Sequence, residues 1–532
     1  MKLNNVLFLI IATLLMALPA SYEPHHFAKT LFMGALLQSF TISTVMLCLV
    51  RKSIVWKRVI LTVLYLLFCL ETYVYIQFQS RFDPNMLTLI LQTNTREASE
   101  FFSVFILSLS TLILFVIMAI GLYAILKSMR LSRNIAFLKK KIVLAAVALL
   151  SLSGLAITVF PLPFPLGNNT LSELYTSFQF VRDSHQDISK MEATIDKIKI
   201  TAYPPDDAPV IVLVIGESYN KHHSSLYGYP LLTSPLLMKE QEDSLLICFS
   251  NAVSPTNSTS EAMRYIFTLK GCESESTDDE RPFVLMPAVF RKAHYNVLYF
   301  DNQYTRSTGG SLDFSCGYFL NPSYINTSCF DFRNTELKSF DDDFITYYQS
   351  KFRTKPRSLN IIHLMGQHFD AANRFPDSFT HFTQNDIKRN DLSASQRQQV
   401  ADYDNATLYN DLVLKHIFDY FRKVNAIVVY LSDHGEQIYD GSHHYYGRTF
   451  GSYQEEETIK AVYEVPFMIW CSPLYRQLNS DTYQQLQQSK ERPLCTADLC
   501  YLLFELAGIE FNYHVPSRSV INDSYTPHRV NH

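Results

Sequence analysis

The sequence lacks an excess of charge of either sign. Its 46 Lys and Arg residues nearly balance 50 Asp and Glu residues, which gives a formal net charge of -4 and a pI near 6.5. Without a basic surface or an acidic tail, no nucleic acid is expected among the partners. Internal repeats and low-complexity segments are also absent, so a repeat architecture is not indicated.

Long apolar runs are absent after residue 166, but five of them lie before it. They cover residues 3–20, 29–50, 57–78, 103–126 and 142–166. Each is long enough to cross a bilayer, which takes about 20 residues. We therefore predict a five-helix transmembrane domain over 1–166. The first run also resembles a signal peptide that ends at "ALPAS", and its cleavage would leave the rest of the chain on the same side.

The loops between these runs carry an uneven distribution of positive charge. The loop after the second run contains Arg51, Lys52, Lys57 and Arg58, and the loop after the fourth is also rich in Lys and Arg. Such loops lie on the cytoplasmic side. The chain after residue 166 is therefore predicted to lie outside the cytoplasm.

That outer part of the chain contains seven cysteines in an oxidising compartment, where disulfides persist. Cys316 and Cys329 are close in sequence and are expected to form a local disulfide. The odd number leaves at least one thiol unpaired. The seven are Cys248, Cys272, Cys316, Cys329, Cys471, Cys495 and Cys500.

Three further segments complete the predicted organisation. The loop at about 80–102 mixes apolar and polar residues, which predicts an amphipathic helix at the outer membrane interface. Residues 167–208 are polar and end in "AYPPDDAP", which is typical of a connector. The remaining chain, 209–532, is predicted to be one soluble domain.

Short apolar runs alternate with helical stretches after residue 209. They are "VIVLVI" at 210, "YNVLYF" at 295, "LNIIHLM" at 359, "AIVVYL" at 426 and "VPFMIW" at 465. Continuous runs of this length suit strands that are covered on both faces, so we predict an α/β domain. In such sheets the functional residues collect at the carboxyl ends of the strands.

Polar residues follow three of these predicted strands. Glu217 follows "VLVIG", Asp433 and His434 follow "VVYLS", and His368 follows "IIHLMGQ". Carboxylates and imidazoles at one sheet edge form a ligand set for a divalent metal such as zinc. Glu217 could instead be an acid at a helix start, where the helix dipole stabilises it. For the adjacent Asp and His, the alternative is a turn with a hydrogen-bonded pair, which is the less favoured interpretation.

A metal held by two carboxylates and one imidazole keeps a position open for a nucleophile or a substrate oxygen. Three hydroxyls in "NSTS" compete for the role of nucleophile: Ser258, Thr259 and Ser260. They open a predicted helix whose first N–H groups could hold a phosphate. An ordinary helix N-cap is the simpler interpretation of the same residues.

An ordered series of motifs gives these residues a context. "GESYNKHHSSLYGYPLLTSP" is followed by the hydroxyl cluster, "DNQ", "HLMGQH", "YDNATLYND" and "SDHGE". The series resembles the phosphoethanolamine transferases of the bacterial inner membrane, which include lipid A modifying and colistin (polymyxin) resistance enzymes. They belong to the sulfatase and alkaline phosphatase superfamily. The resemblance covers nearly the whole chain and implies a five-helix transmembrane bundle followed by a periplasmic α/β sulfatase-like domain.

The resemblance also implies a zinc site. In the family, zinc is held by a glutamate, an aspartate, a histidine and a threonine nucleophile that becomes modified. The matching positions are Glu217, Asp433, His434 and Thr259. Bonding to the metal would lower the pKa of the hydroxyl and direct it at phosphorus. One tightly bound zinc ion is implied, with a second during turnover as an open alternative.

Further positions match residues that contact the substrate in the family. His368 matches a histidine that contacts the phosphoryl group or acts as an acid, and either His443 or His444 matches a second one. Thr93 and Glu97 match the helix that binds the lipid substrate, and Arg306 stands in for a lysine. These residues are Thr93, Glu97, Arg306, His368, His443 and His444.

The chain also departs from the family pattern. Leu89 replaces an asparagine of the lipid-binding helix, and the cysteines that flank the nucleophile are missing, with Pro255 and Tyr265 near their places. The disulfides must therefore differ, and the acceptor is not implied by the resemblance.

The implied function is transfer of phosphoethanolamine by a monomeric membrane enzyme. Thr259 attacks phosphatidylethanolamine and releases diacylglycerol, and the group then passes to lipid A, the lipopolysaccharide core, a glucan or a protein. Two alternatives are a glycerol phosphate transferase similar to lipoteichoic acid synthases and a non-catalytic envelope protein on the same fold. A true sulfatase is disfavoured because the sequence has no "CxPxR" motif.

Overall fold

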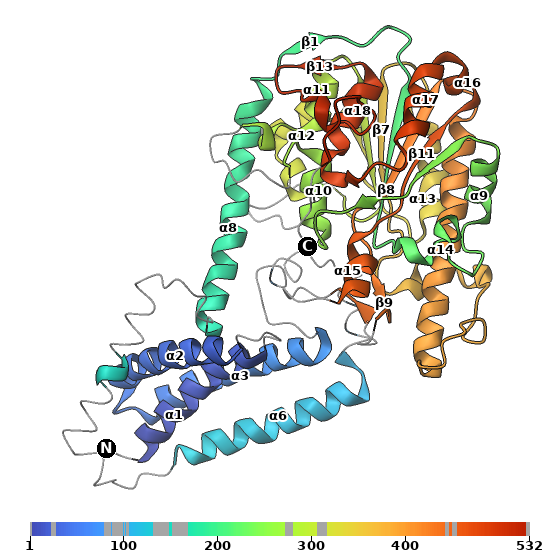
Figure 1. Ribbon diagram of the computed structural model, residues 1–532. Coiled ribbons are helices and arrows are strands. Elements are labelled where there is room, and N and C mark those ends of the chain that lie inside the picture. The colour runs from blue at the N-terminus through green and yellow to red at the C-terminus, as the bar shows by residue number, and fades with distance from the viewer. Residues whose placement is uncertain are drawn as a thin grey trace. The chain divides into compact units, whose positions relative to one another are not determined.

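The chain folds into two compact units, one formed by Met1–Asp183 with Thr449–Gln454 and the other by Ser184–Arg448 with Glu455–His532 (Figure 1). The computed structural model describes residues 3–22, 28–78, 87, 99, 102, 106–130, 148–151, 169–271, 280–305, 317–441, 446–448 and 455–527.

The first unit consists of long apolar helices. They are α1 (Leu3–Ala17), extended by a 3-10 turn at Leu18–Tyr22, α2 (Ala28–Val50), α3 (Ile54–Phe78) and α6 (Leu109–Ser128). Among the described residues, four segments are long and apolar enough to cross a membrane: Leu3–Tyr22, Phe32–Val50, Ile54–Gln77 and Thr111–Ser128. They match the first four predicted runs. The fifth, 142–166, lies outside the described residues except for the helical stretch 148–151.

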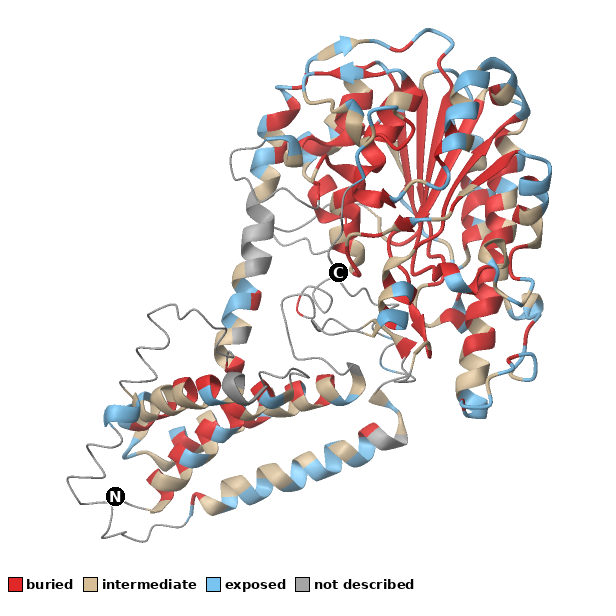
Figure 2. Cartoon of the chain, viewed as in Figure 1, coloured by how far each residue is buried: buried red, intermediate tan, exposed pale blue. Residues whose placement is uncertain are grey.

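Helix α6 shows why this unit suits a lipid environment. Its apolar residues Ile113, Val116, Ile117 and Ile120 are each more than half exposed, and Figure 2 shows the helix largely pale blue and tan. A continuous exposed apolar surface of this kind is unfavourable in water and marks a membrane or protein contact. Helix α1, by contrast, packs its side chains inside the unit, where Phe8 and Ala12 are fully buried.

The second unit is built on a seven-stranded sheet of order β3-β11-β8-β2-β7-β5-β6. The strands are β2 (Val210–Gly216), β3 (Leu246–Phe249), β5 (Asn296–Asp301), β6 (Phe332–Arg333), β7 (Ser358–His363), β8 (Ala426–Ser432) and β11 (Phe467–Cys471). Strand β11 runs antiparallel to β3 and β8, whereas β8, β2, β7, β5 and β6 are parallel. All five predicted strands are confirmed, and the two edge strands β3 and β6 were not predicted.

Both faces of the sheet are buried, as continuous apolar strands require. In β2, Ile211, Leu213 and Ile215 enter one core cluster, while the alternating residues Val210, Val212 and Val214 enter the other. Burying each such side chain contributes roughly 1.5–3 kcal/mol. The central strand is therefore fixed firmly, and so is the residue at its end.

Helices cover the two faces of the sheet (Figure 1). One core includes residues of α10 (Thr259–Phe267), α11 (Met286–Lys292), α18 (Leu499–Ala507) and the end of α8 (Thr170–Ile195). The other includes residues of α9 (Pro235–Glu242), α13 (Asp341–Tyr348) and α14 (Ala394–Phe421).

The polar segment after residue 167 contains helix α8, followed by strand β1 (Ile200–Ala202). Strand β1 pairs antiparallel with β13 (Glu510–Phe511). Met191 and Ile195 of α8 are buried in the core of the second unit. This segment therefore joins the sheet domain through packing and strand pairing.

The expected disulfide between Cys316 and Cys329 is wrong, because Cys329 is a free and fully buried thiol. It ends helix α12 (Ser323–Cys329), which turns the side chain into the apolar core, and burial raises the pKa of the thiol. Spacing in the sequence cannot reveal this orientation. Cys248, Cys471 and Cys500 of the second unit are also free thiols.

The carboxyl group of Glu464 should make the stability of the fold depend on pH. It follows α15 (Glu456–Tyr463), and hydrogen bonds from His222 at 3.1 Å and Lys221 at 2.8 Å lower its pKa from 4.5 to about 2. Because the pKa is lower in the folded state, ionised Glu464 stabilises the fold fully above about pH 4.5, and this contribution is lost as pH falls toward 2. Glu464→Gln should therefore lower the thermal midpoint at pH 7 and have a progressively smaller effect below pH 4.5.

The measurement is thermal unfolding of the full chain in detergent between pH 3 and 7. Glu457→Gln, on the same helix, is the matched control and should leave the midpoint unchanged. An equal loss at pH 3 and pH 7 for Glu464→Gln would contradict the assignment.

Candidate metal centre and nucleophile

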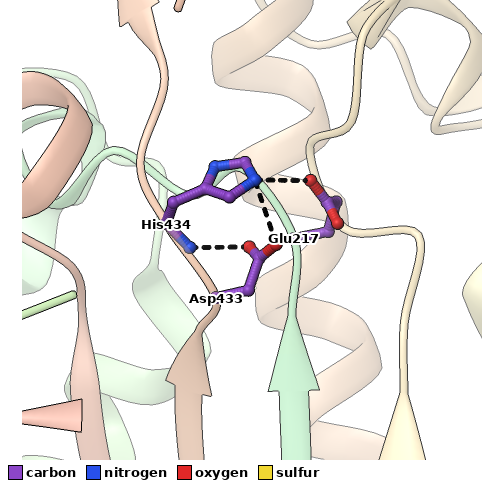
Figure 3. Close-up of side chains that lie close together, drawn as sticks. All are labelled: Glu217, Asp433 and His434. Carbon is purple, nitrogen blue, oxygen red and sulfur yellow. Dashed lines mark hydrogen bonds and ion pairs between the residues drawn. The ribbon is translucent and has the colours of Figure 1, made fainter. Parts of the chain in front are cut away.

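Two neighbouring strands bring three metal-ligating side chains together. Glu217 directly follows β2, and Asp433 and His434 directly follow β8, whose residue Ser432 is paired with Gly216 of β2. All three are fully buried, and their ligand atoms lie within 4.8 Å of one another (Figure 3). Among the described residues, this is the group of histidine, cysteine and acidic side chains that could hold a metal ion.

The turn after β2 orients the carboxylate of Glu217. Ser218 has a φ of +57°, in the left-handed region that costs roughly 1–2 kcal/mol for a residue with a Cβ. Its N–H donates to Asp433 Oδ1 at 3.1 Å, and its hydroxyl donates to Glu217 Oε1 at 2.8 Å. Ser218 thus connects the two acids.

The hydrogen bond from Nδ1 of His434 to the backbone leaves Nε2 as the ring nitrogen that can bind a metal. Its Nδ1 lies 2.9 Å from the carbonyl oxygen of Gly435, which can only accept, so this nitrogen carries a proton. Its Nε2 faces Asp433 Oδ2 at 3.0 Å and Glu217 Oε1 at 3.3 Å. A backbone carbonyl that fixes the tautomer in this way is the usual support of a metal-bound histidine.

The charges of the cluster require a cation between them. Asp433 Oδ2 is buried and makes no hydrogen bond among the described residues as long as Nε2 of His434, 3.0 Å away, carries no proton. Burial and Arg448 lower the pKa of His434, but Asp433 and Glu217 outweigh them and raise it to about 9. Burial raises the pKa of Glu217, yet His434, His368 and Arg448 together hold it well below its usual range. These residues fit a divalent metal ion in donor type and in charge.

Thr259 places a hydroxyl against this cluster. It is the first residue of α10, and its Oγ1 lies 3.1 Å from His434 Nε2, 3.2 Å from Glu217 Oε2 and 3.3 Å from Glu217 Oε1. Ser258 is the N-cap residue, but its side chain makes no capping hydrogen bond. Of the three hydroxyls considered from sequence, Thr259 is the one that contacts both Glu217 and His434.

His368 lies close enough to the cluster to influence its charge. It follows β7, and its Nδ1 donates to the carbonyl oxygen of Phe369 at 2.7 Å. Burial raises the pKa of both Glu217 and Glu436, and the positive form of His368 opposes this rise. The pKa of Glu217 ends well below its usual range, whereas that of Glu436 stays raised. This influence on Glu217 and Glu436 places the imidazole of His368 near the predicted metal ligands.

The other predicted substrate residues fall on parts of the chain outside those that the structure describes. They are Thr93, Glu97, Arg306, His443 and His444. Their roles stay predictions.

Gln303 contacts the cluster but was not selected from the sequence. Its side-chain N–H group donates to Glu217 Oε2 at 3.0 Å and to the carbonyl oxygen of Leu364 at 2.9 Å. The residue follows strand β5 within "DNQ", so the rule that functional residues lie at strand ends would have pointed to it. It holds the second oxygen of Glu217 in place.

Arg448 is a further contact that the sequence did not reveal. It follows β10 (Tyr446–Gly447), which pairs with β9 (Gln437–Ile438) just beyond the "SDHGE" motif. Its Nη1 donates to His434 Nε2 and, at 2.9 Å, to the carbonyl oxygen of Asn257. Its Nε lies 3.4 Å from Glu436 Oε2. No strand-end or spacing signal marks an arginine fourteen positions after His434.

Gly366 allows a test of whether the position of Glu217 depends on the close approach of the two backbone segments. It has a φ of +50°, and a Cβ there would lie 2.7 Å from Glu217 O and 2.8 Å from Glu217 N. Gly366→Ala should displace Glu217 and weaken binding of zinc, as the probe ion, by about 10–100-fold, the range measured when the support of a metal ligand is lost. Competition with a chromophoric chelator measures this affinity.

Gly228→Ala is the matched control for backbone strain. Gly228 also has a positive φ, +97°, but a Cβ there would meet nothing within 4 Å. It should retain zinc affinity. Equal affinities of Gly366→Ala and the unchanged chain would show that Glu217 does not depend on this close approach.

Comparison with known proteins places the fold and the site in a family. The sulfatase model matches residues 209–509, which include Glu217, Thr259, Asp433 and His434. A second model, described as phosphoethanolamine transferase EptA/EptB, matches residues 39–168. The chain belongs to the sulfatase family. Within it, the chain is a phosphoethanolamine transferase with an apolar helical unit and a sulfatase-like α/β domain, as predicted.

Individual relatives agree with this assignment. The chain is 26% identical to phosphoethanolamine transferase EptC of Escherichia coli K12 over 481 residues, 85% of this chain and 79% of that one. The crystal structure of the periplasmic domain of E. coli EptC, a complex with Zn, is 26% identical, with a TM-score of 0.53, and covers 62% of this chain and 91% of that one. The lipooligosaccharide phosphoethanolamine transferase EptA of Neisseria meningitidis, an integral membrane protein, shares the fold over 97% of this chain and 98% of its own, with a TM-score of 0.65 at 16% identity.

Proposed function

We propose that this enzyme takes phosphoethanolamine from phosphatidylethanolamine, holds it on Thr259, and passes it to an acceptor of the bacterial envelope. The observation that carries the proposal is the contact of Thr259 Oγ1 with both Glu217 and His434. A hydroxyl at this place is the open position of a three-ligand metal site. The apolar helices favour a lipid donor and a location in the inner membrane, with the sheet domain in the periplasm.

Zinc is the proposed metal, held by Glu217, Asp433, His434 and the hydroxyl of Thr259. Mixed oxygen and nitrogen donors suit this ion, and the E. coli EptC domain was solved with Zn. When bound, zinc would lower the pKa of the hydroxyl and stabilise negative charge on the phosphoryl oxygens. Gln303 and Gly435 keep the ligand atoms of Glu217 and His434 in place.

The residues around Thr259 can carry out the transfer in two steps. Thr259 Oγ1 bonds to phosphorus, the bond from phosphorus to the diacylglycerol oxygen breaks, and Glu217, at 3.2 Å, is positioned to accept the hydroxyl proton. His368 is the proposed acid that protonates the departing oxygen. An acceptor oxygen then bonds to phosphorus, the bond from phosphorus to Thr259 Oγ1 breaks, and Thr259 regains its proton from Glu217. His368, deprotonated in the first step, takes the proton of an acceptor hydroxyl. The first N–H groups of α10 can bind phosphoryl oxygens during both steps.

Intact mass spectrometry of the zinc-loaded full chain in detergent tests the covalent step. Incubation with phosphatidylethanolamine should add the mass of one phosphoethanolamine group, and peptide mapping should place it on Thr259. Thr259→Ala should give no adduct, because its side chain has no oxygen to bond to phosphorus. Ser258→Ala, one residue away, is the matched control and should still form the adduct.

Two further arms separate the competing functions. Phosphatidylglycerol in place of phosphatidylethanolamine should give no adduct, whereas a glycerol phosphate adduct would identify a glycerol phosphate transferase. Removal of the metal with a chelator should abolish the adduct, and added zinc should restore it. A zinc-loaded chain that gains no mass from either lipid would indicate a non-catalytic protein on this fold.

A further inference from the structure

Arg448 lies between the nucleophile segment and the metal ligands. Its guanidinium donates to the carbonyl oxygen of Asn257, two residues before Thr259, and to Nε2 of His434. Glu436 Oε2, 3.4 Å from Nε, forms an ion pair with it. The side chain is mostly buried, with 13% of its surface exposed. These contacts hold one cation beside the hydroxyl of Thr259.

One of these contacts is incompatible with metal binding. The neutral ring of His434 is the form that can accept from Arg448 or bind a metal; in it Nδ1 carries the proton donated to Gly435, and Nε2 has a single lone pair. A metal ion and Arg448 Nη1 cannot both use that lone pair. When a metal is bound to Nε2, the N–H of Arg448 must find another acceptor, while the contacts to Asn257 and Glu436 can keep the guanidinium at the site.

The chemistry of the site identifies that acceptor. Three carboxylates, Glu217, Asp433 and Glu436, lie around the cluster and oppose the entry of an anionic phosphodiester. A guanidinium offsets this repulsion, and its five N–H groups match phosphate oxygens in geometry. The hydrogen bond to Asn257 holds the guanidinium near Thr259, the residue that is proposed to attack phosphorus.

We propose that Arg448 is a catalytic residue that releases His434 on metal binding and then donates to a non-bridging oxygen of the transferring phosphoryl group. The role in transfer rests on the proposed function, but the binding of phosphate does not. Arg448 therefore has two measurable effects. It competes with the metal for His434, and it binds phosphate once the metal is present.

Binding of inorganic phosphate tests the second effect without turnover. The zinc-loaded full chain with Thr259→Ala cannot form an adduct, and its phosphate affinity can be measured by calorimetry. Adding Arg448→Gln should weaken phosphate binding at least tenfold, and Arg448→Lys should weaken it less because the charge is kept. Arg389→Gln is the control, since Arg389 pairs with Asp391 on the surface, and it should leave the affinity unchanged.

Zinc affinity and the rate of adduct formation complete the test. Arg448→Gln should bind zinc at least as tightly as the unchanged chain, because a competitor for His434 has been removed. With phosphatidylethanolamine it should form the Thr259 adduct about 10²-fold more slowly, the loss typical of one transition-state donor. A thermal midpoint equal to that of Arg389→Gln shows that the variant is folded.

The outcomes separate this proposal from the proposed function. Unchanged phosphate affinity in Arg448→Gln, or weaker zinc binding, would overturn the role of Arg448 even if the unchanged chain forms its adduct. If the unchanged chain forms no adduct with phosphatidylethanolamine but loses phosphate affinity on Arg448→Gln, the proposed function fails and the phosphate site at Arg448 stands.

Discussion

The structure of the site depends on one electrostatic constraint, the close packing of two carboxylates and an imidazole nitrogen that are all fully buried. Parallel pairing of β2 with β8 puts Glu217 and the adjacent Asp433 and His434 at the same level of the sheet. Buried like charges at this separation are unfavourable unless a cation lies between them. Three cations can neutralise these charges: protonated His434, the guanidinium of Arg448 and a metal ion.

The surrounding scaffold resists relaxation of this arrangement. Apolar side chains cover both faces of β2, so the strand cannot shift without exposing a core. The backbone around Gly366 and Gly435 passes so close to its neighbours that a Cβ would not fit; at Gly435 it would lie 2.1 Å from the carbonyl oxygen of Ala461. Hydrogen bonds from Ser218 and Gln303 fix the two oxygens of Glu217 separately. The scaffold therefore keeps the donor atoms in fixed positions. Metal binding and phosphoryl transfer both require this.

The sheet domain and the apolar helices provide two different environments. The helices provide the exposed apolar surface that a lipid environment accepts, as in α6. The sheet provides a buried polar site that would be too costly within lipid. The proposed lipid donor, with its phosphorus at the membrane surface, would need both. The two matching family models cover these two parts of the chain.

Elements with strong local patterns were predictable from the amino-acid sequence. Apolar runs located four helices and five strands, because burial on all sides leaves a continuous hydrophobic signal. Polar residues after predicted strands indicated Glu217, Asp433 and His434, and the resemblance to a known family selected Thr259 from three hydroxyls. Tertiary structure alone decided which groups touch. Short edge strands carry little signal, Cys329 turns into the core although its spacing suggested a disulfide, and Arg448 reaches His434 only because β10 folds back on β9. Contacts of this kind depend on how distant segments pack, which no local pattern in the sequence encodes.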